Sequence, residues 1–268
     1  MGVSEDRFMI DHTIVSHDQW VAARQRLLAK EKDFLRLRDQ LSRERRELPW
    51  ERVSKPYAFE GVNGRESLAD LFDGRSQLIV YHFMFAPEWD AGCPGCSFWA
   101  DSFNDVVSHL NQRDVSFVAV SRAPLRKLQA FAARMNWNFK WVSSADCDFN
   151  FDYQVSFRPE DMARGTAVYN YKPYEREMTD MPGFSVFFKD GAEIFYTYST
   201  FARGLDSMNA AYQLLDLVPK GRDEAGLPFP MAWVKLHDQY VQPGQTEYPW
   251  RAVTGVERPH SLASGGAT

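Results

Sequence analysis

Apolar residues recur at helical spacing through residues 17–48, where charged residues separate them. Positions three, four and seven apart lie on one face of an α-helix, so this pattern predicts a single long helix with one apolar stripe. Ser16 or Asp18 is placed to cap its beginning, and Pro49 ends it. The stripe consists of Leu27, Leu28, Phe34, Leu35, Leu37 and Leu41.

The central part of the chain changes to continuous apolar runs, which are typical of strands buried on both faces of a sheet. Residues 77–85 and 115–121 are such runs. Each is followed by a segment with helical spacing, about 97–110 and 124–135. The order strand, helix, strand, helix predicts parallel strands joined by a crossover connection.

Weaker signals flank these central segments. Residues 57–60 indicate a short strand, and the Asn-Gly dipeptide at 63–64 is typical of a tight hairpin turn. A helical turn is expected within residues 65–72, whereas residues 139–160 show no regular period.

The last third of the chain begins with a hairpin pattern. An Asp-Gly dipeptide at 190–191 separates the apolar runs 184–188 and 193–199, which predicts two antiparallel strands. Helices are expected at about 204–217 and over 230–240. The order βαβ followed by ββα is that of the thioredoxin fold. We therefore predict an α/β protein with a central mixed sheet.

These patterns divide the chain into three parts. Residues 1–50 form an N-terminal helical extension, residues 51–218 the thioredoxin-like domain, and residues 219–268 a C-terminal extension packing on the same domain. The N-terminal helix is too long for one face of a domain this size to cover. We therefore expect a homodimer with this helix at the interface; the competing expectation is a helix bent near residues 30–33.

Composition and charge narrow the class of function. The chain has 31 basic and 36 acidic residues and a formal net charge of −5, which argues against general nucleic-acid binding. No apolar run reaches the ~18–20 residues that a membrane-spanning helix needs. The N-terminus lacks the apolar core of a secretory signal. We expect a cytoplasmic protein that binds neither nucleic acid nor membrane.

Two of the three cysteines are close together, in the sequence Cys93-Pro94-Gly95-Cys96 between a predicted buried strand and a predicted helix. The N-terminus of a helix stabilises a thiolate, the reactive form of cysteine, through its dipole and free N–H groups. Cys93, in the loop, is the expected nucleophile. Cys96, in the first turn, is the expected resolving thiol.

Metal binding and haem attachment are the alternatives for the cysteine pair. A single Cys-x-x-Cys is half of a zinc site, but the chain has no second such pair and no His pair at zinc-finger spacing. Haem attachment requires histidine directly after the second cysteine, where Ser97 stands. Cys147 is interpreted as a small apolar residue. We expect no metal and no bound organic cofactor.

At the segment GCPGCSFWAD the chain resembles a bacterial thioredoxin-like family of unknown function, whose members are labelled predicted dithiol–disulfide oxidoreductases. The resemblance covers almost the whole chain and includes LADLFDGRSQLIVYHFMFAPEW, FVAVSRAPLRKLQAF and PMAWVKLHDQY. It implies the thioredoxin-like fold and, by analogy with that fold, thiol–disulfide chemistry.

A broader similarity to thioredoxins and peroxiredoxins implies further site residues. Pro182 matches the proline, usually cis, that packs beside the active cysteines and shapes a backbone edge for an extended substrate. His82 stands in the strand where thioredoxins keep a buried proton-transferring aspartate; an ordinary buried histidine is the alternative. Trp89, Pro94 and Trp99 are assigned to substrate binding, with ordinary packing as the alternative for the two tryptophans.

Thiol–disulfide exchange with a protein or small-molecule disulfide is therefore the predicted function. A thiol peroxidase is the second hypothesis, although the peroxiredoxin pattern Pro-x-x-x-Thr-x-x-Cys is absent: Pro87 is followed by Glu-Trp-Asp-Ala-Gly before Cys93. A non-enzymatic redox sensor or interaction module is the third. The arginine that peroxiredoxins use has no match by motif; Arg122, Arg158 and Arg203 are candidates.

Overall fold

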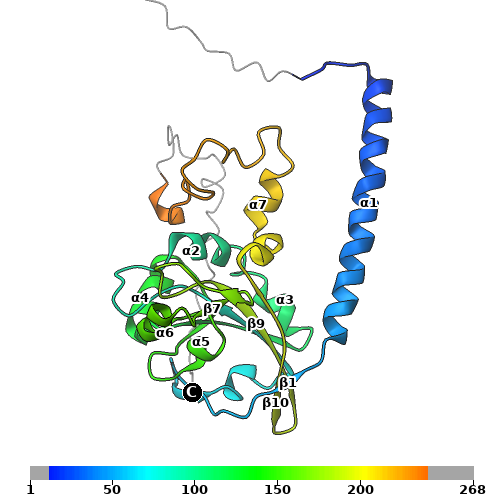
Figure 1. The fold of residues 1–268 in the computed structure, drawn as a ribbon. Coiled ribbons are helices and arrows are strands. Elements are labelled where there is room, and N and C mark those ends of the chain that lie inside the picture. The colour runs from blue at the N-terminus through cyan, green and yellow to red at the C-terminus, as the bar shows by residue number, and fades with distance from the viewer. Residues whose placement is uncertain (1–11, 241–268) are drawn as a thin grey trace, which may run out of the picture.

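The computed structural model describes residues 12–240 and has the α/β architecture of a thioredoxin-like fold (Figure 1). Its centre is an eight-stranded mixed sheet with the order β1-β10-β9-β4-β5-β6-β2-β3. The strands of this sheet are β1 (Glu51–Arg52), β2 (Ala58–Gly61), β3 (Gly64–Ser67), β4 (Gln77–His82), β5 (Val115–Ser121), β6 (Lys140–Ser143), β9 (Gly183–Asp190) and β10 (Glu193–Phe201). A separate short hairpin comprises β7 (Val168–Tyr169) and β8 (Lys172–Pro173).

Helices connect the strands and cover the sheet. The α-helices are α1 (His17–Glu47), α2 (Pro94–Ala100), α3 (Val107–Asn111), α4 (Leu125–Arg134), α5 (Phe149–Asp152), α6 (Pro159–Arg164) and α7 (Ala210–Leu215). The 3₁₀ turns are η1 (Asp70–Phe72), η2 (Ala202–Met208) and η3 (His237–Gln239).

The predicted βαβ-ββα order is confirmed. β4, β5 and β6 are parallel, β9 lies antiparallel to β4, and β10 lies antiparallel to β9. The four strands β5, β4, β9 and β10 are neighbours in that order, which is the thioredoxin-like arrangement. The predicted hairpin turn at residues 63–64 joins β2 to β3.

Side chains of β4 alternate between two cores, one on each face of the sheet. Tyr81 lies in β4 and Phe83 follows the strand directly; both belong to the aromatic core that also contains Cys96. Leu78 and Val80 belong to the core on the other face. Because successive strand residues point to opposite faces, this alternation decides which residues of β4 can reach the cysteines.

Three predicted helices differ from the structure. The helix expected over 204–217 is divided into the 3₁₀ turn η2 and the short α7, because Asn209 between them is extended and its side chain caps α7 by accepting a hydrogen bond from the Tyr212 N–H. The helix expected over 97–110 is divided into α2 and α3, because Asp101, Ser102, Asn104 and Asp105 favour turns and the intervening N–H groups bond three residues back. The helix expected over 230–240 is wrong: only η3 is helical there. Pro228 and Pro230 lack N–H donors, and the Met231 N–H donates to the Glu224 carboxylate instead of continuing a helix.

The predicted N-terminal helix is confirmed as α1, continuous through residues 30–33 and begun by a capping box between Ser16 and Gln19. It extends along one side of the molecule (Figure 1). None of its residues is buried, and the apolar stripe is exposed to solvent. A contact with the domain occurs near its end, where the Arg45 guanidinium lies 5.4 Å from the Tyr198 ring centre. Within residues 12–240 no helix has the length and apolarity to cross a membrane.

Candidate active site

The two cysteines lie where the loop after β4 turns into α2. Cys93 is the half-buried N-cap residue, and Cys96 is buried in the first turn. The Cys93 N–H donates to the Met84 carbonyl at 3.1 Å, and the Met84 N–H points to the Cys96 Sγ at 3.5 Å. Gly92 allows this close return, since a Cβ there would lie 2.6 Å from the Phe83 ring. Both thiols are free and reduced.

The Cys93 thiol is the more acidic of the two. Hydrogen bonds from the Cys96 thiol and from the N–H groups of Cys96 and Gly95 lower its pKa from 9.0 to about 7, against the opposing effect of burial. α2 is only seven residues long. The thiolate is therefore stabilised by specific local donors rather than by the long helix that the sequence predicts.

Cys96 has the opposite character, since burial and the neighbouring Cys93 raise its pKa well above 9.0. A hydrogen bond from Tyr81 acts in the other direction and favours the Cys96 thiolate. While Cys96 is a thiol, the single proton of the Tyr81 hydroxyl is donated to the Cys96 carbonyl at 3.1 Å. The Tyr81 ring stacks on Phe184 with centres 4.8 Å apart. Tyr81 is a site residue that the sequence analysis missed.

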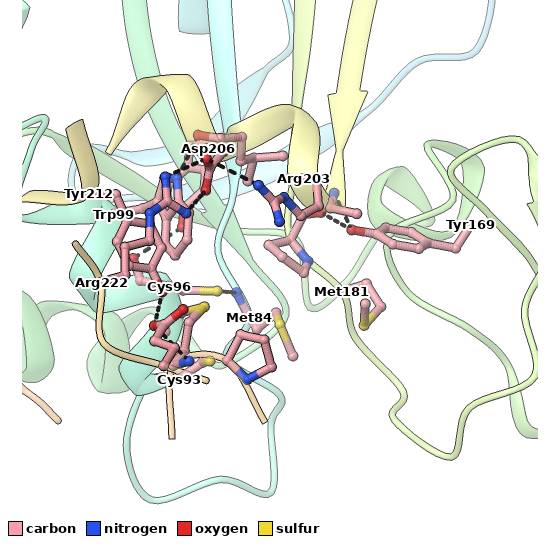
Figure 2. Close-up of a pocket in the computed structure, with 18 of the residues that line it drawn as sticks. Met84, Cys93, Cys96, Trp99, Tyr169, Met181, Arg203, Asp206, Tyr212 and Arg222 are labelled. Atoms are coloured by element: carbon pink, nitrogen blue, oxygen red, sulfur yellow. Dashed lines mark hydrogen bonds and ion pairs between the residues drawn. The ribbon is translucent and has the colours of Figure 1, made fainter. Parts of the chain in front are cut away.

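A cavity of about 740 Å³ opens above the two cysteines. Figure 2 shows Cys93, Cys96 and Trp99 on one side of it and Tyr169 and Met181 on the other. It is enclosed in part by the C-terminal segment, residues 219–240, which is anchored through Glu224. The Glu224 carboxylate accepts hydrogen bonds from three donors: the Tyr212 hydroxyl, the Met231 N–H and the Trp233 indole N–H.

Charged groups line the same cavity, and of these only Arg203 is among the arginine candidates named from the sequence. Arg222 forms two hydrogen bonds with each of the carboxylates of Asp206 and Asp216, at 2.7 to 2.9 Å. Arg176 and Arg203 are exposed, and Arg203 reaches Asp206 only at 3.7 Å. Apart from Arg176, these residues lie within residues 203–224, but their spacing forms no recognisable motif.

Pro182 lines the same cavity as both cysteines. Its peptide bond is trans, because no cis peptide bond occurs within residues 12–240. The backbone edge beside it is not open to a substrate, contrary to the expectation from thioredoxins. The Met181 N–H donates to the Val155 carbonyl at 2.8 Å, and the Phe157 N–H donates to the Thr179 carbonyl at 2.9 Å.

His82 lies away from the cysteines. Successive residues of β4 face opposite sides of the sheet, so His82 points away from the side of Tyr81 and Cys96. Its Nε2 lies 2.8 Å from the Ser185 hydroxyl, its ring packs against Phe149, and burial lowers its pKa to about 3. The position matches the alternative of an ordinary buried histidine, and we assign it no role in proton transfer.

The three residues predicted to bind substrate are placed differently. Trp99 lines the cavity, and its indole N–H donates to the Leu205 carbonyl at 2.7 Å. Pro94 is exposed beside Cys93, and Trp89 is half-buried in the preceding loop, where Lys127 bonds its carbonyl at 2.7 Å. Neither Pro94 nor Trp89 lines the cavity.

Of the other arginine candidates, Arg122 forms a bidentate ion pair with the buried Asp180, and Arg158 pairs with Asp148. Cys147 is half-buried, and burial raises the pKa of its thiol. Within residues 12–240 no group of three or more His, Cys, Asp or Glu side chains is arranged to hold a metal ion.

Comparisons with known proteins give a family and partial structural likenesses. A family model described as "Bacterial protein of unknown function (DUF899)" matches residues 9–240. No curated protein matches the chain.

Solved structures similar to the chain include a Mycobacterium tuberculosis peroxidoxin, BcpB, with 16% identity, coverage of 62% of this chain and 97% of that one, and a TM-score of 0.43. Xanthomonas campestris peroxiredoxin Q has 16% identity, coverage of 62% and 97%, and a TM-score of 0.41. A candidate thiol–disulfide oxidoreductase from Bacteroides vulgatus has 19% identity, coverage of 39% and 70%, and a TM-score of 0.30.

Proposed function

The chain belongs to the DUF899 family of bacterial proteins of unknown function, and we propose that it is a thiol–disulfide oxidoreductase with Cys93 as nucleophile and Cys96 as resolving thiol. One observation carries the proposal: two hydrogen-bonded free thiols have pKa values shifted in opposite directions, and both line one cavity. The more acidic thiol is also the less buried one, as a nucleophile should be.

The reaction proceeds in two exchanges. The Cys93 thiolate attacks one sulfur of a substrate disulfide, forms a mixed disulfide, and releases the other sulfur as a thiolate. Formation of the mixed disulfide removes the negative charge on Cys93 that raises the Cys96 pKa. Cys96 then loses its proton, attacks the Cys93 sulfur and releases the second substrate thiolate. Two electrons pass from the protein to the substrate, and the protein ends as the Cys93–Cys96 disulfide.

A disulfide-reduction assay tests this function. With dithiothreitol as the reductant, the protein should accelerate reduction of hydroxyethyl disulfide or insulin, and Cys93→Ser should abolish the acceleration. Cys147→Ser is the matched control and should leave the rate unchanged, because Cys147 lies outside the cavity. A wild-type protein that reduces neither disulfide contradicts the proposal.

A stopped-flow measurement with hydrogen peroxide distinguishes the peroxidase hypothesis. A peroxidase would oxidise Cys93 rapidly to sulfenic acid, which Cys96 would condense with. We expect reaction with peroxide to be slower than reaction with disulfides, because the described cavity lining contains no threonine beside Cys93. Rapid oxidation by peroxide together with no reduction of disulfides would replace the proposed function. Reaction with neither would favour the redox sensor.

A cytoplasmic location is part of the same proposal. It is supported by the small and odd number of cysteines, three in the chain, which is a poor framework for the structural disulfides of a secreted protein.

A further inference from the structure

The backbone around Pro182 is already bonded within the chain. The bonds of Met181 to Val155 and of Phe157 to Thr179 form a short antiparallel pairing centred on Ser156 and Asp180. An extended peptide substrate would need a free backbone edge to add itself as a strand. Segment 155–157 of the same chain occupies that edge.

The next backbone group along the chain is also occupied. The Tyr169 hydroxyl donates to the Pro182 carbonyl at 2.7 Å and accepts a hydrogen bond from the Ala202 N–H at 3.0 Å. Tyr169 therefore ties the Pro182 segment to the beginning of η2. Opening this edge for a protein substrate would break hydrogen bonds on both sides of Pro182, which makes strand addition unfavourable.

The approach to Cys93 is restricted from the other side by the C-terminal segment. A Cβ added to Gly95 would lie 3.0 Å from the Met231 Cε and 3.6 Å from the Cys93 Sγ, so Met231 lies over the active-site turn. The remaining cavity of about 740 Å³ is within the range of small-molecule sites, about 300–1,000 Å³. A small disulfide fits such a space better than a folded protein does.

Three arginines and three carboxylates line the cavity, so their formal charges balance, but the carboxylates are held by other groups while Arg176 and Arg203 are exposed. Its acidic groups are engaged: Asp206 and Asp216 bind Arg222, and Glu224 accepts three hydrogen bonds. Arg203 keeps its side chain 87% exposed, and Arg176 forms no ion pair within residues 12–240. Arginine is well suited to binding carboxylates through paired hydrogen bonds.

We propose that the substrate of the Cys93–Cys96 pair is a small disulfide bearing carboxylate groups, bound through Arg176 and Arg203, rather than an extended segment of a protein. This inference rests on the proposed function and names its substrate class. In the reaction, the carboxylates remain on the arginines while Cys93 attacks the disulfide. Two small anionic thiols leave as the protein disulfide forms. A dithiol reductant returns the protein to its reduced state.

Three small disulfides of different charge test the proposal. The reduced protein is mixed separately with oxidised glutathione as the anionic probe, hydroxyethyl disulfide as the neutral one and cystamine as the cationic one. Each rate constant is divided by that of dithiothreitol with the same disulfide, which removes the intrinsic reactivity of the probe. We expect the highest ratio for oxidised glutathione, and we expect added salt to lower that ratio.

The double variant Arg176→Gln/Arg203→Gln should lower the ratio for oxidised glutathione by about a hundredfold, the effect of losing one hydrogen bond to a charged group at each arginine. The ratio for hydroxyethyl disulfide should not change. Arg36→Gln is the matched control, because Arg36 lies on α1 with 74% of its side chain exposed. A charge preference that is absent, or that persists in the double variant, overturns the inference.

Insulin separates failure of this inference from failure of the proposed function. If the protein reduces insulin faster than all three small disulfides, the proposed function stands and the substrate class is wrong. If it reduces neither insulin nor any small disulfide, both are wrong. The salt dependence of the wild-type protein provides a result even if the double variant does not fold.

Discussion

The Tyr81 hydroxyl donates a hydrogen bond to the Cys96 carbonyl beneath the first turn of α2, at 3.1 Å. Both residues are buried, and the same hydroxyl favours the Cys96 thiolate. Tyr81→Phe keeps the ring that stacks on Phe184 and removes only this donor. We expect resolution of the mixed disulfide by Cys96 to slow by about tenfold, the effect of one buried hydrogen bond to a charged group.

Single-turnover kinetics check the Tyr81 prediction. The first exchange, at Cys93, should change little, because no hydrogen bond joins Tyr81 to the Cys93 thiol. Phe103→Leu is a control for the packing around Tyr81, since the Phe103 ring contacts Tyr81 with centres 5.3 Å apart but carries no donor. Equal slowing of both exchanges by Tyr81→Phe would indicate a purely structural role.

The second prediction concerns the pH dependence of alkylation. The Cys93 pKa is lowered to about 7, so the thiolate fraction and the alkylation rate should rise with pH through about 7 and level off above it. An ordinary thiol would reach this plateau above its pKa of about 8.5. The variant Cys96→Ala/Cys147→Ser lacks the Cys96 donor, so the midpoint of its iodoacetamide reaction rate should lie above about 7.

The decisive comparison is between the midpoint of Cys93 alkylation in the wild-type protein and the midpoint in the variant. Peptide mapping follows the alkylation of Cys93 separately from that of the other cysteines. A lower midpoint in the wild-type protein than in the Cys96→Ala variant is expected, because the hydrogen bond from the Cys96 thiol is the largest cause of the lowered Cys93 pKa. Faster alkylation of Cys96 than of Cys93 would reverse the roles of the two cysteines.

The sequence predicts those helices and strands whose own residues show a clear pattern of apolar and polar positions. Residues 115–121 form β5 as predicted, because a continuous apolar run bounded by polar residues is decisive by itself. β6 was missed within residues 139–160, since its four residues show no period of their own. β6 is defined by pairing with β5, in which Val142 lies beside Val120, and such a partner is not visible in one sequence.

In the candidate site, too, the sequence reveals what adjacent residues carry and misses what depends on tertiary contacts. The Cys-Pro-Gly-Cys motif identified Cys93 and Cys96, because four adjacent residues carry the information. Alternation along β4 separates Tyr81 from His82, but nothing local indicates which of the two shares a face with Cys96. The bonds of Glu224 to Tyr212 and of Met181 to Val155 depend on the tertiary fold. The closed edge and the charged cavity were therefore missed.

The buried His82 should make the protein sensitive to acid. Its pKa is about 3 in the folded state, against 6.5 as the ordinary value, so the unfolded chain takes up a proton that the folded chain does not. The wild-type protein should therefore lose about 1.4 kcal/mol of stability for each pH unit below about 6.5, relative to a variant without this group.

Urea unfolding of the wild-type protein and His82→Gln at pH 7.5, 6 and 5 measures this difference. Glutamine does not titrate and retains hydrogen-bonding atoms for Ser185. Because the two proteins share every other titratable group, the difference between their unfolding free energies reports the titration of His82 alone. We expect the stability advantage of the wild-type protein to shrink as the pH falls. A difference that stays constant with pH would contradict the buried neutral state of His82.

The exposed stripe of α1 predicts self-association, and we propose a homodimer through this helix. Trp20, Leu27, Phe34 and Leu41 are spaced seven residues apart, and their exposed fractions range from 42% to 64%. Such a repeat suits pairing with a second helix, and an exposed patch of this kind is unfavourable in a monomer.

Light scattering measures the mass of the full chain. We expect a dimer for the wild-type protein and a monomer for Leu27→Glu/Phe34→Glu, because two charges would enter the interface. Leu217→Glu is the control outside α1, at a residue that is 80% exposed. A wild-type protein that stays monomeric at high concentration would contradict the dimer and leave the cysteine chemistry unaffected.

Trapping of the mixed disulfide tests the central assignment most directly. The Cys96→Ser variant lacks the resolving thiol, so reaction with oxidised glutathione should stop at a stable adduct, which mass spectrometry of the digested protein would locate. We expect one glutathione on Cys93, and no adduct at Cys96 in Cys93→Ser over the same time. An adduct that forms on Cys147, or equally fast on Cys96 in Cys93→Ser, would contradict Cys93 as the nucleophile.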